Sequence, residues 1–317
     1  MNQNANAILT LCSHLCVGEG VYPLEPKEWG ALAKRLVDQN LEPSDIFLMS
    51  REDFSQKLQL PSGLIDRIFR LIDRNASLIF EITRYENMGI YTVTRADSQY
   101  PMQLKKKLGN QCPPIFYYAG NMELLLKPTV GYVGSRSIGE DDESFTRKMV
   151  ATTTAHGFGV VSGGAKGVDS VAAEAVIENG GFSIAYLSDS MVRKIKRSAE
   201  IKAIQNGQQL LLSVVKPDAG FNPGIAMMRN RYIYAQSEAT IIIKSDYNKG
   251  GTWSGAIENL SHQWSGTFCW DHKKYKGNQA LIQNGAVPID ENWDGDVHAS
   301  RHVRAGIQSQ QLSFFDV

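Results

Sequence analysis

Two short glycine-containing segments carry the residues best suited to bind an anion. The first, Gly134-Ser135-Arg136, ends the apolar run 129–134 and precedes a helix candidate. A glycine lets the backbone come close to a ligand, and the start of the following helix offers free N–H groups and partial positive charge. Arg136 adds a permanently charged donor able to hold a phosphate with two hydrogen bonds. We therefore expect a phosphate-binding turn, although the acids at 140–142 would compete with the anion.

The second segment follows the apolar run 159–163 and also leads into a helix candidate, which Asp169 is expected to cap. In an open α/β sheet, ligands bind beyond the carboxyl ends of the strands. Lys166 is thus expected to project from the same sheet edge as Arg136, so that the two loops define one site. The residues assigned to the site from this second segment are Ser162, Gly163, Gly164 and Lys166.

Catalytic and metal-binding patterns are weak. The sequence has neither a G-x-S-x-G elbow nor a Walker A lysine. Its four cysteines are expected to be reduced, buried thiols, and its histidines lack partners at metal-ligand spacing. Glu258 and Asp169 could serve as acid and base in a nucleotide hydrolase, but no pattern pairs them. We therefore expect no catalytic residues, no metal and no cofactor.

The segments that must position these loops alternate between strand and helix patterns, which predicts βαβ units and a mostly parallel sheet. Several strand candidates are almost entirely apolar, as is typical when helices cover both faces of a sheet. The predicted fold class is α/β, an extended Rossmann-like sheet preceded by a small all-α module. Strands are expected at 90–94, 115–120, 129–134, 159–163, 182–187, 209–214, 239–244 and 266–270, and helices at 140–156, 168–179, 190–205, 224–236 and 252–264.

The chain is long enough for a sizeable core, with 317 residues of which 43% are hydrophobic. We expect a helical N-terminal module over 1–87, with Ser50 and Asp53 in a capping pattern, a Rossmann-like domain over 88–290 and a mobile polar tail over 291–317. Lys and Arg balance Asp and Glu at 33 each, so charge neither supports nor excludes a nucleic-acid partner. No basic leader or membrane-length apolar stretch is evident, which favours a cytoplasmic protein without a membrane partner.

The motifs, taken in order, resemble those of the DNA-processing protein A (DprA/Smf) family over roughly residues 85 to 290. The family's G-S-R turn and S-G-x-A-[KR]-G-[IV]-D segment match 134–136 and 162–169. Its R-N-R-x-I helix matches Arg229, Asn230 and Arg231, its small-residue loop matches Gly250, Gly251 and Thr252, and its G-x-N-x-L-I segment matches 277–286. The chain departs from many relatives in lacking a histidine soon after Asp169 and a C-terminal winged helix.

The resemblance implies a non-catalytic, dimeric protein that binds single-stranded DNA, loads a RecA-type recombinase and acts in recombination or natural transformation. It assigns the residues of both glycine loops, the R-N-R helix and the 250–252 loop to the nucleic-acid site. One alternative is a nucleotide-binding sensor or nucleotide hydrolase of the wider superfamily. It is favoured by the partial resemblance of the segment from Gly250 to Glu258 to the G-G-x-G-T-x-x-E motif of the related hydrolases. Another is an accessory of a defence system.

Two further segments are candidate interaction sites. A basic run is expected to extend the phosphate groove through Arg193, Lys194, Lys196 and Arg197. Phe221, Tyr232, Tyr247 and Trp253 are candidates for stacking on bases. Near the C-terminus, the peptide containing Gln311, Leu312, Phe314 and Phe315 resembles the short Q-L-x-L-F sequence that docks on bacterial sliding clamps; the alternative is that these apolar residues pack on the protein's own domain.

Overall fold

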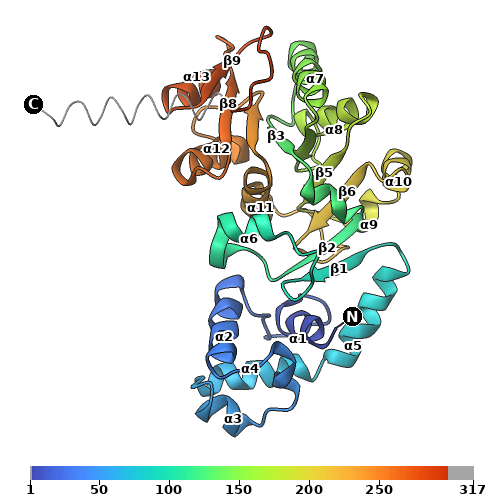
Figure 1. Cartoon of the computed structure of the whole chain (residues 1–317), viewed down its shortest axis with the longest axis vertical. Helices are drawn as coiled ribbons and strands as arrows, with labels where there is room; N and C mark the ends of the chain where they lie inside the picture. The colour runs from blue at the N-terminus through green and yellow to red at the C-terminus, as the bar shows by residue number, and fades with distance from the viewer. Residues whose placement is uncertain (1, 299–317) are drawn as a thin grey trace, which may run out of the picture. The chain divides into compact units, whose positions relative to one another are not determined.

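The computed structural model describes residues 2–298 (Figure 1). The chain divides into two compact units. Among the described residues, the first unit contains 2–119, 189–197 and 212–220, and the second contains 120–188, 198–211 and 221–298. The first unit therefore takes in more than the helical module expected at 1–87.

The first unit begins with short helices and continues into an antiparallel strand pair. Ser50 and Asp53 form the predicted capping box, since the Ser50 hydroxyl accepts from Asp53 N and the Asp53 carboxylate accepts from Ser50 N at 2.9 Å. The helices are α1 (Gln3–Cys12), α2 (Pro26–Asp38), the 3-10 helix η1 (Pro43–Phe47), α3 (Arg51–Gln56), α4 (Ser62–Ile72), α5 (Asn75–Glu86), α6 (Met102–Leu108), η2 (Gly109–Gln111) and α9 (Met191–Lys194). Strands β1 (Tyr91–Thr94) and β2 (Ile115–Gly120) pair antiparallel.

The second unit is built on a sheet with strand order β6-β5-β4-β3-β7-β8-β9, whose pairs β5–β4, β4–β3, β3–β7, β7–β8 and β8–β9 are all parallel. The residues of these strands are almost all buried, as their apolar sequences predicted. The strands are β3 (Thr129–Val133), β4 (Gly159–Ser162), β5 (Ser183–Leu187), β6 (Gln209–Ser213), β7 (Ala239–Ile242), β8 (Gly266–Trp270) and β9 (Val287–Ile289).

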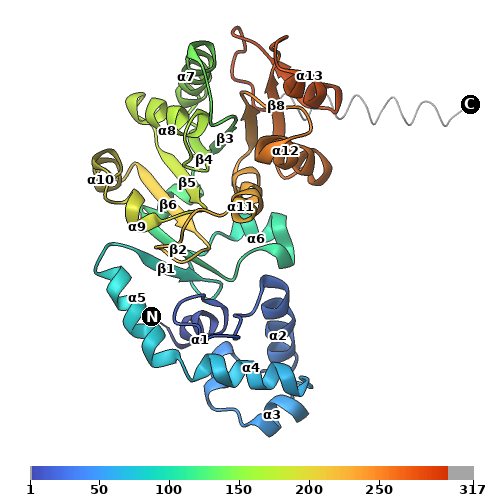
Figure 2. The ribbon, with the colours of Figure 1, turned by 180° about the vertical axis from the view of Figure 1, so that it is seen from behind.

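Helices cover both faces of this sheet, which confirms the predicted fold class. On one face the Tyr132 hydroxyl lies 2.7 Å from Thr153 Oγ1 of α7. On the other, the ring of Tyr186 lies 5.6 Å from that of Tyr232 in α11. The helices are the 3-10 helix η3 (Met122–Leu126), α7 (Glu140–Ala155), α8 (Val168–Glu178), α10 (Ser198–Gln205), α11 (Pro223–Gln236), α12 (Gly250–His262) and α13 (Lys276–Gln283). Figure 2 shows α7 beside α8 and α12 beside α13.

Several sequence expectations need correction. The helix expected at 190–205 is two helices, α9 and α10, and α6, α13 and β9 were not predicted. Residues 291–298 are not a free tail, because the ring of Trp293 lies 5.4 Å from that of Phe268 and Val297 is only 4% exposed. Cys16 is exposed, unlike the other three cysteines. Among the described residues, no helix combines the length and apolar character needed to cross a membrane.

Candidate functional site

The topology of the second unit creates a crevice beside β3. The chain leaves β3 through α7 toward β4 on one side, whereas β7 lies on the other side. Loops that follow such a switch point diverge and leave room for a ligand. A pocket of about 470 Å³ lies there. It is lined by residues 133–136, Ala165, Asp169, Phe221, Pro223, Ala226, Met227, Arg229, Asn230, Ile233, Lys244, Asp246 and residues 249–252.

The two glycine loops contact each other directly, as their common sheet edge predicts. Val168 N donates to the Ser135 carbonyl at 3.3 Å. A Cβ atom on Gly134 would lie 2.4 Å from Val168 Cγ2, and one on Gly167 would lie 2.3 Å from the Ser135 carbonyl oxygen. Gly167 also has a φ of +80°, in the region that favours glycine. The close approach of these loops therefore depends on glycine at both positions.

Alanine at Gly167 should destabilise the protein more than alanine at Gly180. Both glycines have positive φ, but a Cβ on Gly180 would meet no described atom within 4 Å. Gly180→Ala should therefore cost only the conformational penalty of about 1–2 kcal/mol. Gly167→Ala adds a clash with backbone, so its unfolding temperature should fall further and its pocket should lose ligand binding. Equal unfolding temperatures for the two variants would contradict the close approach.

Asp169 lies in the first turn of α8, and it is not the N-cap residue that the sequence led us to expect. The N-cap of α8 is Gly167, and the Asp169 carboxylate accepts from Gly163 N at 2.9 Å and Ala165 N at 3.3 Å. Burial raises the pKa of Asp169, while the nearby Arg229 guanidinium and the two amides oppose that rise. Two amides of this loop are thus occupied by the protein's own carboxylate.

Arg229 forms a buried ion pair with Asp169. Its Nη1 atom lies 4.0 Å from Asp169 Oδ2, and the two side chains are only 5% and 11% exposed. A Cβ on Gly163 would lie 1.3 Å from the same Nη1, so Gly163 makes room for the guanidinium. Ser162 is fully buried, and its hydroxyl accepts from Gly164 N at 3.2 Å. Ser162, Gly163 and Gly164 therefore shape the loop from outside the pocket lining.

The first loop presents Arg136 to solvent at the pocket. The Arg136 guanidinium lies 4.6 Å from the centre of the Phe221 ring, and Phe221 is 47% exposed. Lys166 is also exposed, but it lies outside the lining of the pocket. An arginine stacked on an accessible aromatic ring offers a charged donor and an apolar surface in one place.

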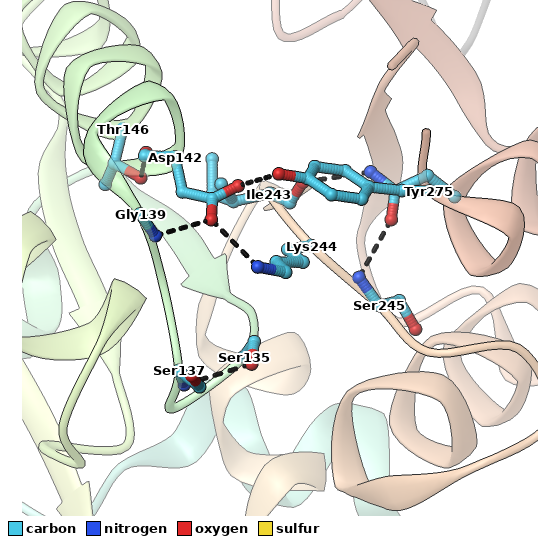
Figure 3. A network of polar contacts seen from close by, with 10 residues as sticks. Ser135, Ser137, Gly139, Asp142, Thr146, Ile243, Lys244, Ser245 and Tyr275 are labelled. Atoms are coloured by element: carbon cyan, nitrogen blue, oxygen red, sulfur yellow. Dashed lines mark hydrogen bonds and ion pairs between the residues drawn. The ribbon is translucent and has the colours of Figure 1, made fainter. Parts of the chain in front are cut away.

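A buried network beside the pocket accounts for Asp142, one of the acids at the start of α7 (Figure 3). Asp142 is 1% exposed and accepts from Gly139 N at 2.9 Å, the Tyr275 hydroxyl at 2.5 Å and Lys244 Nζ at 3.0 Å. Burial raises the pKa of Asp142, but these three donors outweigh burial and leave the pKa below its ordinary value. Asp142 thus holds Lys244 in place through an ion pair.

The first residues of α12 complete the pocket. Its N-cap, Lys249, makes no side-chain capping bond, so the amides of Gly250, Gly251 and Thr252 give the pocket the positive end of a 13-residue helix. Asn230 Nδ2 donates to the Gly251 carbonyl at 3.0 Å and fixes this end against α11. Lys244 and Lys249 were absent from the predicted site, although Lys244 is the last residue of the strand predicted at 239–244 and Lys249 lies in the segment that follows it.

The comparisons with known proteins agree with this architecture. The sequence model described as DNA recombination-mediator protein A matches residues 91–295. The chain belongs to this family. The DNA processing protein DprA of Streptococcus pneumoniae (strain ATCC BAA-255 / R6) is 26% identical over 191 residues, covering 60% of this chain and 64% of that protein. DprA of Bacillus subtilis (strain 168) is 25% identical over 227 residues, covering 68% and 75%. The chain thus matches less than two thirds of the length of the pneumococcal relative.

Solved structures of the DNA recombination-mediator protein A family share the fold. DprA from Streptococcus pneumoniae superposes with a TM-score of 0.65 at 20% identity, covering 87% of this chain and 98% of that chain. A structure concerned with the single-stranded DNA binding mode of DNA processing protein A from Helicobacter pylori has a TM-score of 0.52 at 24% identity, covering 68% and 96%. At these identities the likeness establishes the fold.

Only some of the residues in the family motifs line the pocket. The pocket lining includes Gly134, Ser135, Arg136, Arg229, Asn230, Gly250, Gly251 and Thr252. Arg231 instead pairs with Glu258, with 2.7 Å between Nε and Oε1. Among the proposed stacking residues Tyr232 is 3% exposed and belongs to the core, whereas Tyr247 is 59% exposed and its ring meets Trp253 edge to face.

The structure does not test the two remaining predicted segments. Residues 189–197, which carry Arg193, Lys194, Lys196 and Arg197, belong to the first unit, while the pocket belongs to the second. Their participation in a phosphate groove stays a prediction. The clamp-like peptide with Gln311, Leu312, Phe314 and Phe315 lies outside the described residues.

Proposed function

We propose that this protein binds single-stranded DNA at the pocket beside β3 and acts as a non-catalytic mediator of DNA recombination. The observation that carries the proposal is the concentration of Arg136, Lys244, Lys249 and the α12 amides around one pocket, next to the exposed Phe221 ring. The whole chain has no excess of either charge, so these cations are a local feature of one sheet edge.

The chemistry of the lining favours a single strand. Cations along a groove hold the phosphate backbone whatever its sequence, and exposed aromatic rings stack on bases that are free of a duplex. Phe221, under the Arg136 guanidinium, is such a ring. The family description as a recombination mediator supports this role, and so does the single-stranded DNA binding of the Helicobacter pylori protein. Dimerisation and delivery of a RecA-type recombinase are proposed on the same basis.

The arrangement of the acids supports a binding role over hydrolysis. Glu258, one half of the acid–base pair considered for a nucleotide hydrolase, is bound to Arg231, and Asp169, the other half, is bound to Arg229. Each carboxylate thus has a structural partner. A general base must come within hydrogen-bond reach of the proton it removes, and Glu258 lies outside the pocket lining.

The proposal is tested by titrating the full chain with labelled oligo-dT, thymidine monophosphate and the dinucleotide pTpT at two salt concentrations. Oligo-dT should bind far more tightly than either nucleotide, and log K should fall with log[salt] by about 0.7 per phosphate contacted. The nucleotides should be recovered intact. Tight nucleotide binding without oligo-dT binding, or release of base or phosphate that depends on Glu258, would contradict the proposal.

A further inference from the structure

A second pocket, of about 480 Å³, adjoins the first on the same unit. The two pockets share Lys244, Asp246 and Lys249. The second pocket adds Tyr247 from the loop after β7, and Lys274 and Lys276 around the start of α13. Four lysines and one carboxylate therefore line this cavity, and none of these five charged residues was among the predicted site residues.

The lysines of the second pocket are available to a ligand. Lys249, Lys274 and Lys276 are exposed, and no ion pair joins any of them to another described residue. Lys244 differs, because its ammonium lies 3.0 Å from Asp142 and its side chain is 27% exposed. Exposed like charges that face one cavity repel each other, so an anion that enters the cavity is stabilised by all of them.

The loops carrying these lysines are held in fixed positions. Tyr275, between Lys274 and Lys276, donates its hydroxyl to the buried Asp142 beside the first pocket (Figure 3). The fully buried Asn278 amide donates to the carbonyls of Ile243 at 2.9 Å and Trp270 at 3.0 Å. Its oxygen accepts from Ser245 N at 2.8 Å. These bonds join the start of α7, the residues after β7 and the start of α13, so they fix the segments that line the cavity.

The cations follow the order of the strands. The loops after the consecutive strands β4, β3, β7 and β8 carry Lys166, Arg136, Lys249 and Lys274 in turn. Adjacent strands lie about 4.8 Å apart, so the four loops span roughly 14 Å along the carboxyl edge of the sheet. That length exceeds what one phosphate group needs and suits an extended backbone with several phosphates.

We propose that Lys249, Lys274 and Lys276 form a second phosphate site and that a DNA single strand runs along this edge from the first pocket into the second. Tyr247, supported edge to face by Trp253 at 5.2 Å, lies where a base between the two phosphate sites can stack. The inference rests on the proposed function of the first pocket and extends it to the loops after β7 and β8.

The test compares Lys274→Ala/Lys276→Ala with the matched control Lys148→Ala/Lys202→Ala, whose lysines are exposed on α7 and α10 of the same unit and outside both pockets. For a 20-residue oligo-dT, loss of two phosphate contacts should lower the salt slope by about 1.4 and the affinity at 0.1 M salt by roughly 10- to 30-fold. Binding of pTpT, which the first pocket alone can hold, should not change. The control should bind both probes like the parent protein.

A third variant distinguishes the loss of a phosphate site from damage to the fold. Asp246→Asn removes the carboxylate shared by both pockets, so it should tighten oligo-dT binding, a gain that a damaged fold does not produce. If Lys274→Ala/Lys276→Ala retains the parent affinity and salt slope while an Arg136→Ala variant loses binding, the second site is wrong and the first stands. If the parent protein itself does not bind oligo-dT, both proposals fail.

Discussion

Replacing Arg136 and Lys166 together by alanine should lower the affinity for oligo-dT by roughly 30-fold at 0.1 M salt and reduce the salt slope by about 1.4, as expected for two lost phosphate contacts. The two cations belong to neighbouring loops, which are joined by the hydrogen bond from Val168 N to the Ser135 carbonyl. One DNA strand can therefore contact both cations. Binding isotherms at several salt concentrations measure the affinity and the slope together. A double variant that binds like the parent would disprove the site.

The two positions should contribute unequally. Arg136 lines the pocket and stacks on Phe221, whereas Lys166 is exposed outside the lining, so Arg136→Ala alone should account for most of the affinity loss. Arg136→Lys is the informative control. It keeps the positive charge, and therefore the salt slope, but it lacks the planar guanidinium that binds phosphate with two hydrogen bonds and stacks on the Phe221 ring. Its affinity should fall while its slope remains that of the parent.

The sequence predicted the two glycine loops because each is a local pattern. A buried strand, a turn of small residues and a helix start lie within about a dozen positions in each case, so neighbouring residues alone determine the loop. The same local signal located the start of α12 at Gly250 only approximately, since the helix was expected from 252. Helix ends are less firmly encoded than helix interiors because terminal turns fray.

The rest of the site depends on contacts between distant residues. Lys244 and Lys249 belong to the pocket because β7 lies next to β3, and strand order is not written in any local pattern. Asp169 was expected to cap a helix because it stands at a helix start. Its partner Arg229 is 60 positions away, so no local pattern indicated the ion pair. Trp293 and Val297 are single apolar anchors in a polar segment, so no periodicity indicated that residues 291–298 pack on the sheet.

Arg229→Met should destabilise the protein by about 3–5 kcal/mol, which is the usual cost of leaving one member of a buried ion pair without its partner. Methionine has a similar length but no charge, so the change leaves the Asp169 carboxylate in a site where it is only 11% exposed. The Asp169→Asn/Arg229→Met double variant should be less destabilised than the sum of the two single variants. Additive losses in such a cycle would show that the two side chains are not coupled.

The deficit of Arg229→Met should also depend on pH. Burial already raises the pKa of Asp169, and removal of the opposing guanidinium should raise it further. A carboxyl group whose pKa is higher in the folded than in the unfolded protein binds more protons when folded, so stability falls as pH rises above the unfolded value of about 3.9. Near pH 4.5 the carboxyl of the variant can stay protonated and needs no cation, whereas at pH 7.5 it must ionise or hold its proton at a cost.

Unfolding in urea at these two pH values should therefore show that the variant loses less stability relative to the parent at pH 4.5 than at pH 7.5. A deficit that is the same at both would mean that Arg229 acts through its packing against Gly163 and not through the charge of Asp169.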